Sequence, residues 1–198
     1  MKTLLNVGCG NSNINKIKGF KKDLWNEIRL DIDESVKPDI IGSLVDMKII
    51  KTASIDAIYS AYNLDHIYAH EVPIAIKEFY RVLNEDGIVI VRCPDIQTIC
   101  DAISNDKLLE PIYQSPIGPI SPIDILFGNR KEIVKGNTYM AKKVGFTYSV
   151  LNNTFRDAGF LARYGGRMPA NGGEIAMVAF KQKKSEEEIK LLADPFLF

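Results

Sequence analysis

Leu4-Leu5-Asn6-Val7-Gly8-Cys9-Gly10, close to the N-terminus, is the stretch around which the fold is organised. Residues 4–7 are long enough and apolar enough for a buried strand, and the glycines that follow end it. Glycine has no Cβ atom, so a tight turn can form here and another molecule can lie against the backbone. A strand that ends in a glycine turn at the edge of a sheet is where α/β proteins bind nucleotides.

The segments after this turn alternate as in an α/β protein. We expect further strands at 28–32, 39–44, 55–60 and 88–93, and helices at 21–25 (short and irregular), from Glu71, at 97–103, at 122–127 and from the cap Thr147 or Ser149 to Ala158. Residues 160–167 and 174–181 read as an antiparallel pair of strands at the sheet edge. The order predicts a Rossmann-like open, mostly parallel sheet with a C-terminal antiparallel hairpin.

We expect one domain over residues 1–198, with an insert at about 95–146 and a short C-terminal helix and tail at about 183–198. The insert is rich in proline, and so long a connection between core elements is usually a lid or a binding segment. Ser185 and Glu188 form a capping box for the last helix. The tail 194–198 has an apolar end, which suits docking on a partner or on a second copy in a homodimer.

Composition excludes several classes of protein. Of the 198 residues 46% are hydrophobic, and the 25 basic residues balance the 25 acidic ones, which argues against a nucleic-acid partner. No apolar run approaches the ~20 residues that span a bilayer, so we expect no membrane contact. Cys9, Cys93 and Cys100 have no paired spacing, which favours a reducing, cytoplasmic setting. The cysteines and two histidines are too scattered for a structural zinc site, so we expect no metal.

Two acidic residues are candidates for holding a nucleotide. Asp31 follows Gly10 by roughly the 20 residues expected of an acid that binds ribose, and a carboxylate can accept two hydrogen bonds from a vicinal diol. Asp46, after the next strand, would accept from the exocyclic amine of adenine, and Ile32 and Met47 would sandwich its ring. Both aspartates can equally be plain solvated strand ends.

Several stretches together resemble the class I S-adenosylmethionine-dependent methyltransferases, in particular their type 11 group. Residues 5–10 are similar to the first motif of the family, and Leu30-Asp31-Ile32-Asp33 resembles the second. The stretches 54–59, 64–66 (Leu-Asp-His) and 78–87 are similar to the fourth and fifth motifs. Asp65 replaces the usual Glu, and the turn 84–87 lacks the common Pro and second Gly. The resemblance covers residues 1 to about 95 and resumes over the hairpin, whereas the insert carries no family motif.

The resemblance implies a class I methyltransferase fold and S-adenosylmethionine as cofactor, with S-adenosylhomocysteine as product. It implies that backbone groups of the glycine turn line the methionine part, that Asp31 binds ribose, and that residues past the fourth strand lie near the sulfonium. The cofactor-binding residues expected on this basis are Asn6, Gly8, Cys9, Gly10, Asp31, Ile32, Asp46, Met47, Ser60, Ala61 and Tyr62. The near absence of a helix after the second strand leaves the adenine contacts open.

His66 is the candidate general base, because a histidine suits proton transfer near neutrality, although this loop histidine can also be structural. Tyr62 and Tyr139 are expected to shape the acceptor pocket or else to pack the insert on the core. Arg92 could bind an acidic substrate, pair with Asp95 or be exposed. Lys142 and Lys143 read as a solvated face.

The function expected is methylation of a small-molecule or glycan-type acceptor, at oxygen or nitrogen, by in-line transfer. One alternative is a methyltransferase-like binding subunit without catalysis. Another is an NAD(P)-dependent oxidoreductase, but Asn13 stands where the third glycine of that fingerprint belongs, and the late hairpin does not suit that fold.

Overall fold

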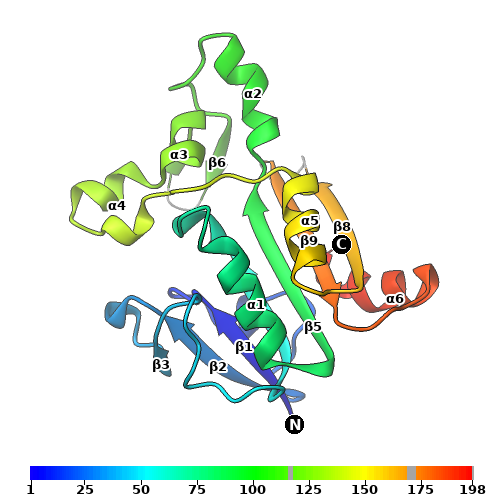
Figure 1. Cartoon of the computed structure of the whole chain (residues 1–198). Helices are drawn as coiled ribbons and strands as arrows, with labels where there is room; N and C mark the ends of the chain where they lie inside the picture. Colours follow the sequence, from blue (N-terminus) through cyan, green and yellow to red (C-terminus); the bar gives the residue numbers. More distant parts are fainter. Residues whose placement is uncertain (116–117, 169–172, 198) are drawn as a thin grey trace.

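A twisted seven-stranded sheet forms the centre of the computed structural model, which describes residues 1–115, 118–168 and 173–197 (Figure 1). Its order is β3-β2-β1-β4-β5-β9-β8. The strands are β1 (Lys2–Val7), β2 (Trp25–Asp31), β3 (Ile40–Ile41), β4 (Ile55–Ala61), β5 (Leu83–Pro94), β8 (Ala162–Met168) and β9 (Glu174–Phe180). Strands β1 to β5 pair in parallel, and β9 runs antiparallel to both β5 and β8. The predicted open sheet with a late antiparallel edge is confirmed.

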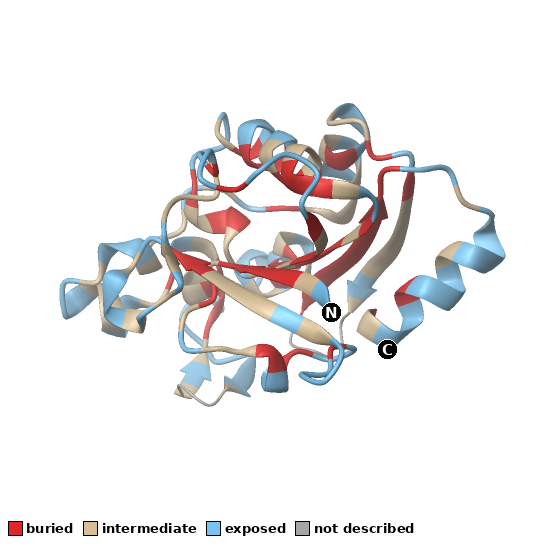
Figure 2. Ribbon diagram, turned by 90° about the horizontal axis from the view of Figure 1, so that it is seen from below, coloured by how far each residue is buried: buried red, intermediate tan, exposed pale blue. Residues whose placement is uncertain are grey.

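One face of the sheet is covered by α1 (Val72–Val82) and α5 (Tyr148–Asp157). Their apolar stripes bury Phe79 and Phe155 against Leu5 and Val7 of β1 and their neighbours. Thr147, one of the two residues expected to cap α5, accepts a hydrogen bond from the backbone N–H of Val150. In Figure 2 the longest red stretches lie along strands of the sheet, and β9 is buried throughout. This packing fixes the strand ends at which the site lies.

The opposite face is covered by α6 (Glu186–Leu197) and by the segment around the 3₁₀ turn η1 (Ile14–Lys16). The helix expected at 21–25 is wrong, because β2 already begins at Trp25. The expected tail is also wrong: α6 continues through Leu197, which is buried, and the ring of Phe196 lies 4.9 Å from that of Phe20. No long helix follows β1 on this face of the sheet. Its apolar side chains would therefore be exposed, and α6 covers them. Phe198 lies outside the described residues.

The segment between β5 and α5 forms a compact layer above the end of β5 (Figure 1). It contains α2 (Ile96–Ser104), β6 (Tyr113–Ser115), β7 (Gly118–Ile120), α3 (Pro122–Phe127), α4 (Arg130–Val134) and the 3₁₀ turn η4 (Thr138–Met140). The helices expected at 97–103 and 122–127 are confirmed within a residue. Backbone pairing of Asp95 with Phe146 closes the base of the insert. The layer therefore sits over the carboxyl edge of the sheet.

The bounds of β5 and β3 differ most clearly from expectation. β5 begins at Leu83, immediately after α1, so residues 84–87 extend the strand where a turn was expected. The pairing with β4 is irregular there, which accommodates the extra residues. β3 is reduced to Ile40–Ile41, because Gly42 and the turn between Ser43 and Asp46 follow at once. Two short 3₁₀ turns, η2 (Glu34–Val36) and η3 (Leu64–His66), follow β2 and β4.

No helix in the described part of the chain has the length and apolar character to cross a bilayer.

Candidate active site

The glycine turn after β1 has the backbone geometry that only glycine adopts easily. Gly8 has φ +62° and Gly10 has φ +49°, both in the left-handed region. The N–H of Gly8 donates to the carbonyl of Leu30 at 2.7 Å, which ties the turn to the end of β2. A Cβ atom on Gly10 would meet no atom within 4 Å, whereas one on Gly8 would lie 2.2 Å from the side chain of Asn63. The turn thus leaves open space above Gly10.

Asp31, the last residue of β2, faces this turn and is only 9% exposed. One carboxylate oxygen accepts from the N–H of Gly10 at 2.7 Å, and the other accepts from the N–H of Asp33 at 2.9 Å. An ionised carboxylate has about four acceptor positions, so each oxygen can accept a further hydrogen bond. The structure therefore places a fixed carboxylate beside the glycine turn, as the sequence predicts.

Arg29 holds the two loops around Asp31 together, a role that the sequence did not indicate. Its guanidinium donates to the backbone carbonyls of Gly10 (2.6 Å), Lys37 (2.9 Å), Ser12 (3.2 Å) and Val36 (3.2 Å). These bonds satisfy the donors of the arginine within the protein, so Arg29 orders the loops and is not positioned to bind a ligand.

A cavity of about 540 Å³ opens between the glycine turn, the loop after β3 and the insert. Its size lies within the usual range for small-molecule sites, ~300–1,000 Å³. Its walls are partly apolar (Leu30, Ile32, Leu44, Val45, Ile67, Met140) and carry the carboxylate of Asp31 at one end. An adenosyl cofactor fits this donor and acceptor pattern: open backbone at the glycine turn, a carboxylate for a diol, and apolar walls for a base.

Five predicted cofactor residues line this cavity: Gly8, Gly10, Asp31, Ile32 and Tyr62. The structure does not bring the other six to its walls: Asn6, Cys9, Asp46, Met47, Ser60 and Ala61. Most of these differences from the prediction have a local cause, which is the direction in which the chain segment turns its side chains.

In the loop after β3, the residues that face the cavity lie two or three positions earlier in the sequence than expected. Ser43 pairs with Asp46 across a turn, which directs Ser43, Leu44 and Val45 to the cavity. Met47 is fully buried in the core, and the carboxylate of Asp46 points to Lys48 at 3.1 Å in solvent. The predicted adenine contacts of Asp46 and Met47 therefore have no counterpart in this geometry.

Asn6 and Cys9 face the protein interior. The side-chain amide of Asn6 donates to Glu27 at 2.8 Å, under the segment that carries η1. Cys9 is buried, and burial raises the pKa of its thiol to about 11, opposed by the nearby Arg29. Ser60, also buried, receives a long hydrogen bond of 3.4 Å from Asn63. These side chains support the turns and do not line the cavity.

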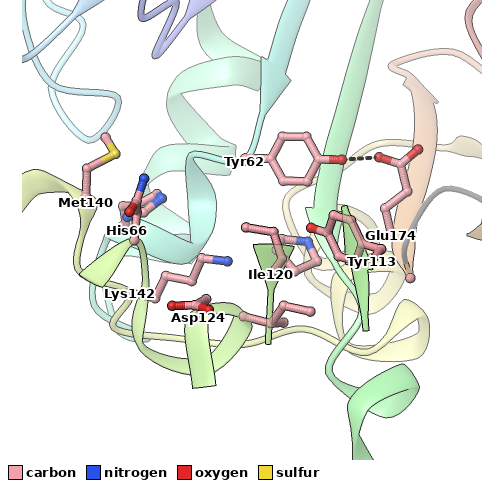
Figure 3. Close-up of a pocket in the computed structure, with 12 residues that line it drawn as sticks. Tyr62, His66, Tyr113, Ile120, Asp124, Met140, Lys142 and Glu174 are labelled. Atoms are coloured by element: carbon pink, nitrogen blue, oxygen red, sulfur yellow. Dashed lines mark hydrogen bonds between the residues drawn. The ribbon is translucent and has the colours of Figure 1, made fainter. Parts of the chain in front are cut away.

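A second, smaller pocket of about 200 Å³ adjoins the first (Figure 3). Tyr62, His66 and Met140 line both spaces, so a group in the second pocket lies next to the cofactor cavity. The second pocket, here called the acceptor pocket, is also lined by Pro94, Tyr113, Ile120, Asp124, Ile125, Asn129, Lys142, Gly173 and Glu174. Most of these residues belong to the insert or to the start of β9, which the motifs did not reach.

Tyr62 stands at the junction of the two spaces in a constrained conformation. Its φ is +57°, which is uncommon for a non-glycine residue, and its hydroxyl donates to Glu174 at 2.5 Å (Figure 3). Burial, together with the hydrogen bond to the Glu174 carboxylate, raises the pKa of the Tyr62 hydroxyl. The ring is therefore held as a neutral phenol between the cavities.

The substrate role expected for Arg92 is not supported, because its guanidinium is committed elsewhere. It forms an ion pair with the buried carboxylate of Glu174 and donates to the carbonyl of Phe196 at 3.0 Å. Arg92 is not among the residues that line the acceptor pocket. It instead links α6 to Glu174, and through Glu174 to the Tyr62 hydroxyl.

Replacing Arg92 by leucine is expected to lower the free energy of unfolding by about 3–5 kcal/mol, because it leaves the Glu174 carboxylate buried without its cation. Urea unfolding measures the change. The double variant Arg92→Leu/Glu174→Gln should recover part of the loss. The matched control is Arg156→Leu, which removes an exposed pair with Asp157 and should cost less than about 1 kcal/mol. An equal, small loss in both arginine variants would refute this assignment.

His66 lies on η3 with one edge of its ring fixed. Its Nδ1 atom lies 3.0 Å from the carbonyl oxygen of Ala141. A carbonyl only accepts, so Nδ1 carries the proton and Nε2 of the neutral ring has a free lone pair. The insert residue Ala141 thus fixes the tautomer that a general base at this position requires.

Two further insert residues differ from expectation. Tyr139 is half-exposed and lines the cofactor cavity but not the acceptor pocket. Lys142 was expected in solvent, yet its side chain is only 12% exposed and its Nζ lies 3.1 Å from a carboxylate oxygen of the buried Asp65. In Figure 3 the Lys142 ammonium points toward the middle of the acceptor pocket. Lys143 is exposed, as expected.

Comparison with known proteins agrees with this geometry. A family model described as a methyltransferase domain matches residues 5–91. Among solved structures, an S-adenosylmethionine-dependent methyltransferase from Archaeoglobus fulgidus superposes with a TM-score of 0.60 at 10% identity, over 90% of this chain and 85% of that one. The citrinin polyketide synthase CMeT domain gives 0.60 at 10% identity, over 92% of this chain but only 47% of that one.

A third structure contains a bound product. It is the 1,6-didemethyltoxoflavin-N1-methyltransferase of Burkholderia thailandensis with 1,6-didemethyltoxoflavin and S-adenosylhomocysteine, which superposes with a TM-score of 0.54 at 14% identity, over 91% of this chain and 71% of that one. No curated protein matches the chain in sequence. At these identities the structures establish the fold, and the family model identifies the domain. The chain therefore has the class I methyltransferase fold, and its residues 5–91 match the methyltransferase domain model.

Proposed function

We propose that the chain methylates a small-molecule or glycan-type acceptor at an oxygen or nitrogen atom. The observation that carries this proposal is the acceptor pocket, which shares Tyr62, His66 and Met140 with the cofactor cavity. Its volume of about 200 Å³ admits a single ring or a comparable group and little more. A small molecule, or one residue of a glycan, is the class of acceptor that such a space accommodates.

The charged groups of the acceptor pocket support an acceptor whose reacting part is neutral and polar. Each charged side chain has a partner of opposite sign: Glu174 pairs with Arg92, Asp124 with Arg130, and Lys142 with Asp65. Tyr62 and Tyr113 add aromatic surface and hydroxyl groups. Hydroxyl-rich rings and small amines can form hydrogen bonds with such groups without an uncompensated charge.

When bound, S-adenosylmethionine supplies a methyl group on a sulfonium, so alignment is the main requirement for transfer. Gly8, Gly10 and Asp31 would hold it from one side, and Tyr62 would line the junction at which its methyl group meets the acceptor. His66 is the proposed general base: its Nε2 lone pair would accept the proton of the acceptor hydroxyl or amine. The insert contributes Met140 to this junction and Ala141 to the wall of the cofactor cavity. A reducing, cytoplasmic setting is part of the proposal, supported by the free thiols Cys9, Cys93 and Cys100.

Replacing His66 by asparagine is expected to reduce kcat by about 10²–10⁴-fold while leaving cofactor affinity unchanged. The asparagine amide can still donate to the Ala141 carbonyl in place of Nδ1, but it removes the Nε2 lone pair. The measurement is S-adenosylhomocysteine formation with a panel of monosaccharides, amino sugars, phenols and small amines. The control is His70→Asn, at an exposed histidine outside both spaces.

Two results would count against this proposal. If no member of the panel is methylated while a macromolecular acceptor is, the acceptor class is wrong. If His66→Asn turns over like the wild type, His66 has only the structural role that its bond to Ala141 suggests.

A further inference from the structure

An open groove leads away from the acceptor pocket between the β6–β7 hairpin and α4. Its volume is about 730 Å³, and it shares Ile120, Asp124 and Asn129 with the acceptor pocket. The three spaces thus form a series from the cofactor cavity through the acceptor pocket to this groove, here called the outer groove. Any part of the acceptor that extends beyond the acceptor pocket would therefore lie in the outer groove.

The floor of the outer groove is apolar and accessible. Leu109 and Val134 are 63% and 88% exposed, and Pro111 and Pro119 extend the same surface. Single exposed apolar residues are ordinary, but four that line one groove beside a polar pocket are typical of a binding surface. The groove therefore offers a surface for a flat or aliphatic part of a ligand.

The rim of the outer groove carries three cations, and one of them, Lys131, makes no ion pair within the described part of the chain. Arg130 makes two hydrogen bonds with Asp124, at 2.7 and 3.2 Å, and Lys135 pairs with Glu132 at 2.7 Å. Within residues 1–115, 118–168 and 173–197, the Lys131 ammonium has neither an ion pair nor a hydrogen bond.

The Lys131 ammonium lies near the opposite wall of the groove. Its Nζ lies 3.1 Å from the point where a Cβ atom on Gly118 would stand, so it reaches across the groove to β7. Burial raises the pKa of Asp124, but the hydrogen bonds from Arg130 and the Ser121 N–H, together with the charges of Arg130 and Lys131, outweigh it and lower the pKa. Asp124 is therefore ionised, and Arg130 is its ion-pair partner. The net charge at the rim is therefore positive, in a chain whose overall charge is zero.

We propose that the outer groove binds a phosphate group carried by the acceptor, with Lys131 as its ligand. A lysine ammonium is a point charge well suited to phosphate, and Arg130 and Lys135 add to the local positive potential. The inference rests on the proposed function: the reacting ring occupies the acceptor pocket and its phosphate lies beyond Ile120. A sugar phosphate and a nucleoside-diphosphate sugar share this chemistry, and in the second case the apolar floor would take the base.

Calorimetry on the full chain loaded with S-adenosylhomocysteine tests this proposal without turnover, using inorganic pyrophosphate and then UDP as probes. We expect pyrophosphate to bind, its affinity to fall roughly tenfold in Lys131→Gln, and the affinity to weaken with added NaCl. Lys51→Gln, at an exposed lysine in the turn before β4, should bind like the wild type. The midpoint of thermal unfolding should be the same in both variants, because neither lysine has an ion-pair partner among the residues that the structure describes.

The two probes distinguish the sources of the phosphate. UDP binding at least tenfold tighter than pyrophosphate indicates a nucleotide-linked acceptor, and equal affinity indicates a sugar phosphate. No binding of either probe, or equal binding by the wild type and Lys131→Gln, overturns the inference. If the probes do not bind but an uncharged acceptor is methylated, only this inference falls. If the probes bind but no small molecule is methylated, the proposed function falls.

Discussion

Replacing Asp31 by alanine is expected to weaken binding of S-adenosylmethionine roughly 10- to 100-fold, since hydrogen bonds to a charged group contribute about 1.5–3 kcal/mol. The carboxylate is almost buried, is fixed by the N–H groups of Gly10 and Asp33, and faces the cofactor cavity. Calorimetric titration with the cofactor measures the loss. The same titration with S-adenosylhomocysteine should show a similar loss, because both molecules carry the same ribose.

The controls separate a direct contact from a loosened loop. Asp31→Asn keeps an acceptor for the Gly10 N–H, so a large loss of affinity in this variant points to the missing charge and not to the turn. Asp46→Ala removes an exposed carboxylate that does not line the cavity and should bind the cofactor normally. Normal affinity in Asp31→Ala, or a comparable loss in Asp46→Ala, would contradict the ribose assignment.

Replacing Gly8 by alanine is expected to lower the free energy of unfolding by about 2–4 kcal/mol and to abolish measurable cofactor binding. A left-handed conformation costs an alanine roughly 1–2 kcal/mol. The new Cβ atom would also stand 2.2 Å from the side chain of Asn63, whose amide donates to the Val7 carbonyl at 2.7 Å. Moving Asn63 breaks that bond and displaces the loop that carries Tyr62 and His66.

Gly10→Ala is the matched variant for this prediction. Gly10 also has a positive φ, but its Cβ would meet no atom, so only the backbone strain is added. The difference in urea unfolding between the two variants therefore isolates the contact with Asn63. If both variants lose the same stability, the close packing of Gly8 against Asn63 is not significant.

The sequence predicted the sheet well because its strands and turns carry local signals. The continuous apolar run 88–91 and the alternation at 28–32 each specify a strand, and Pro94 ends the first of them. Asp31 could be placed at the site because the end of a parallel strand has a fixed relation to the turn of its neighbour. Such features depend on residues that lie within a few positions of one another.

The remaining features could not be predicted because they depend on contacts between distant segments. From the sequence, Arg92 could bind an acidic substrate, pair with Asp95 or be exposed, but its ion-pair partner is Glu174, 82 positions later. Lys142 reads as solvated until Asp65 is placed beside it. The one signal that could have been used is Glu174 itself, an acid at the start of a strand that is otherwise wholly apolar. A charged residue in that position usually has a buried partner.

The loop after β3 illustrates a second limit. Asp46 and Met47 have the residue types expected of an adenine contact, but the turn between Ser43 and Asp46 rotates them away. The Met47 N–H is held by Glu78, 31 positions along the chain, which fixes that rotation. A shift of two or three residues in a loop cannot be predicted from composition, yet it decides which side chains line the cavity.

A crystal structure of the chain grown with S-adenosylhomocysteine tests the central claim most directly. We expect the adenosine to lie across the carboxyl ends of β1 and β2, with the ribose hydroxyls within 2.5–3.2 Å of the Asp31 carboxylate, the usual hydrogen-bond range. The sulfur should face Tyr62 and the acceptor pocket. Product bound elsewhere, or Asp31 turned from the ribose in an otherwise unchanged fold, would contradict the assignment of the site.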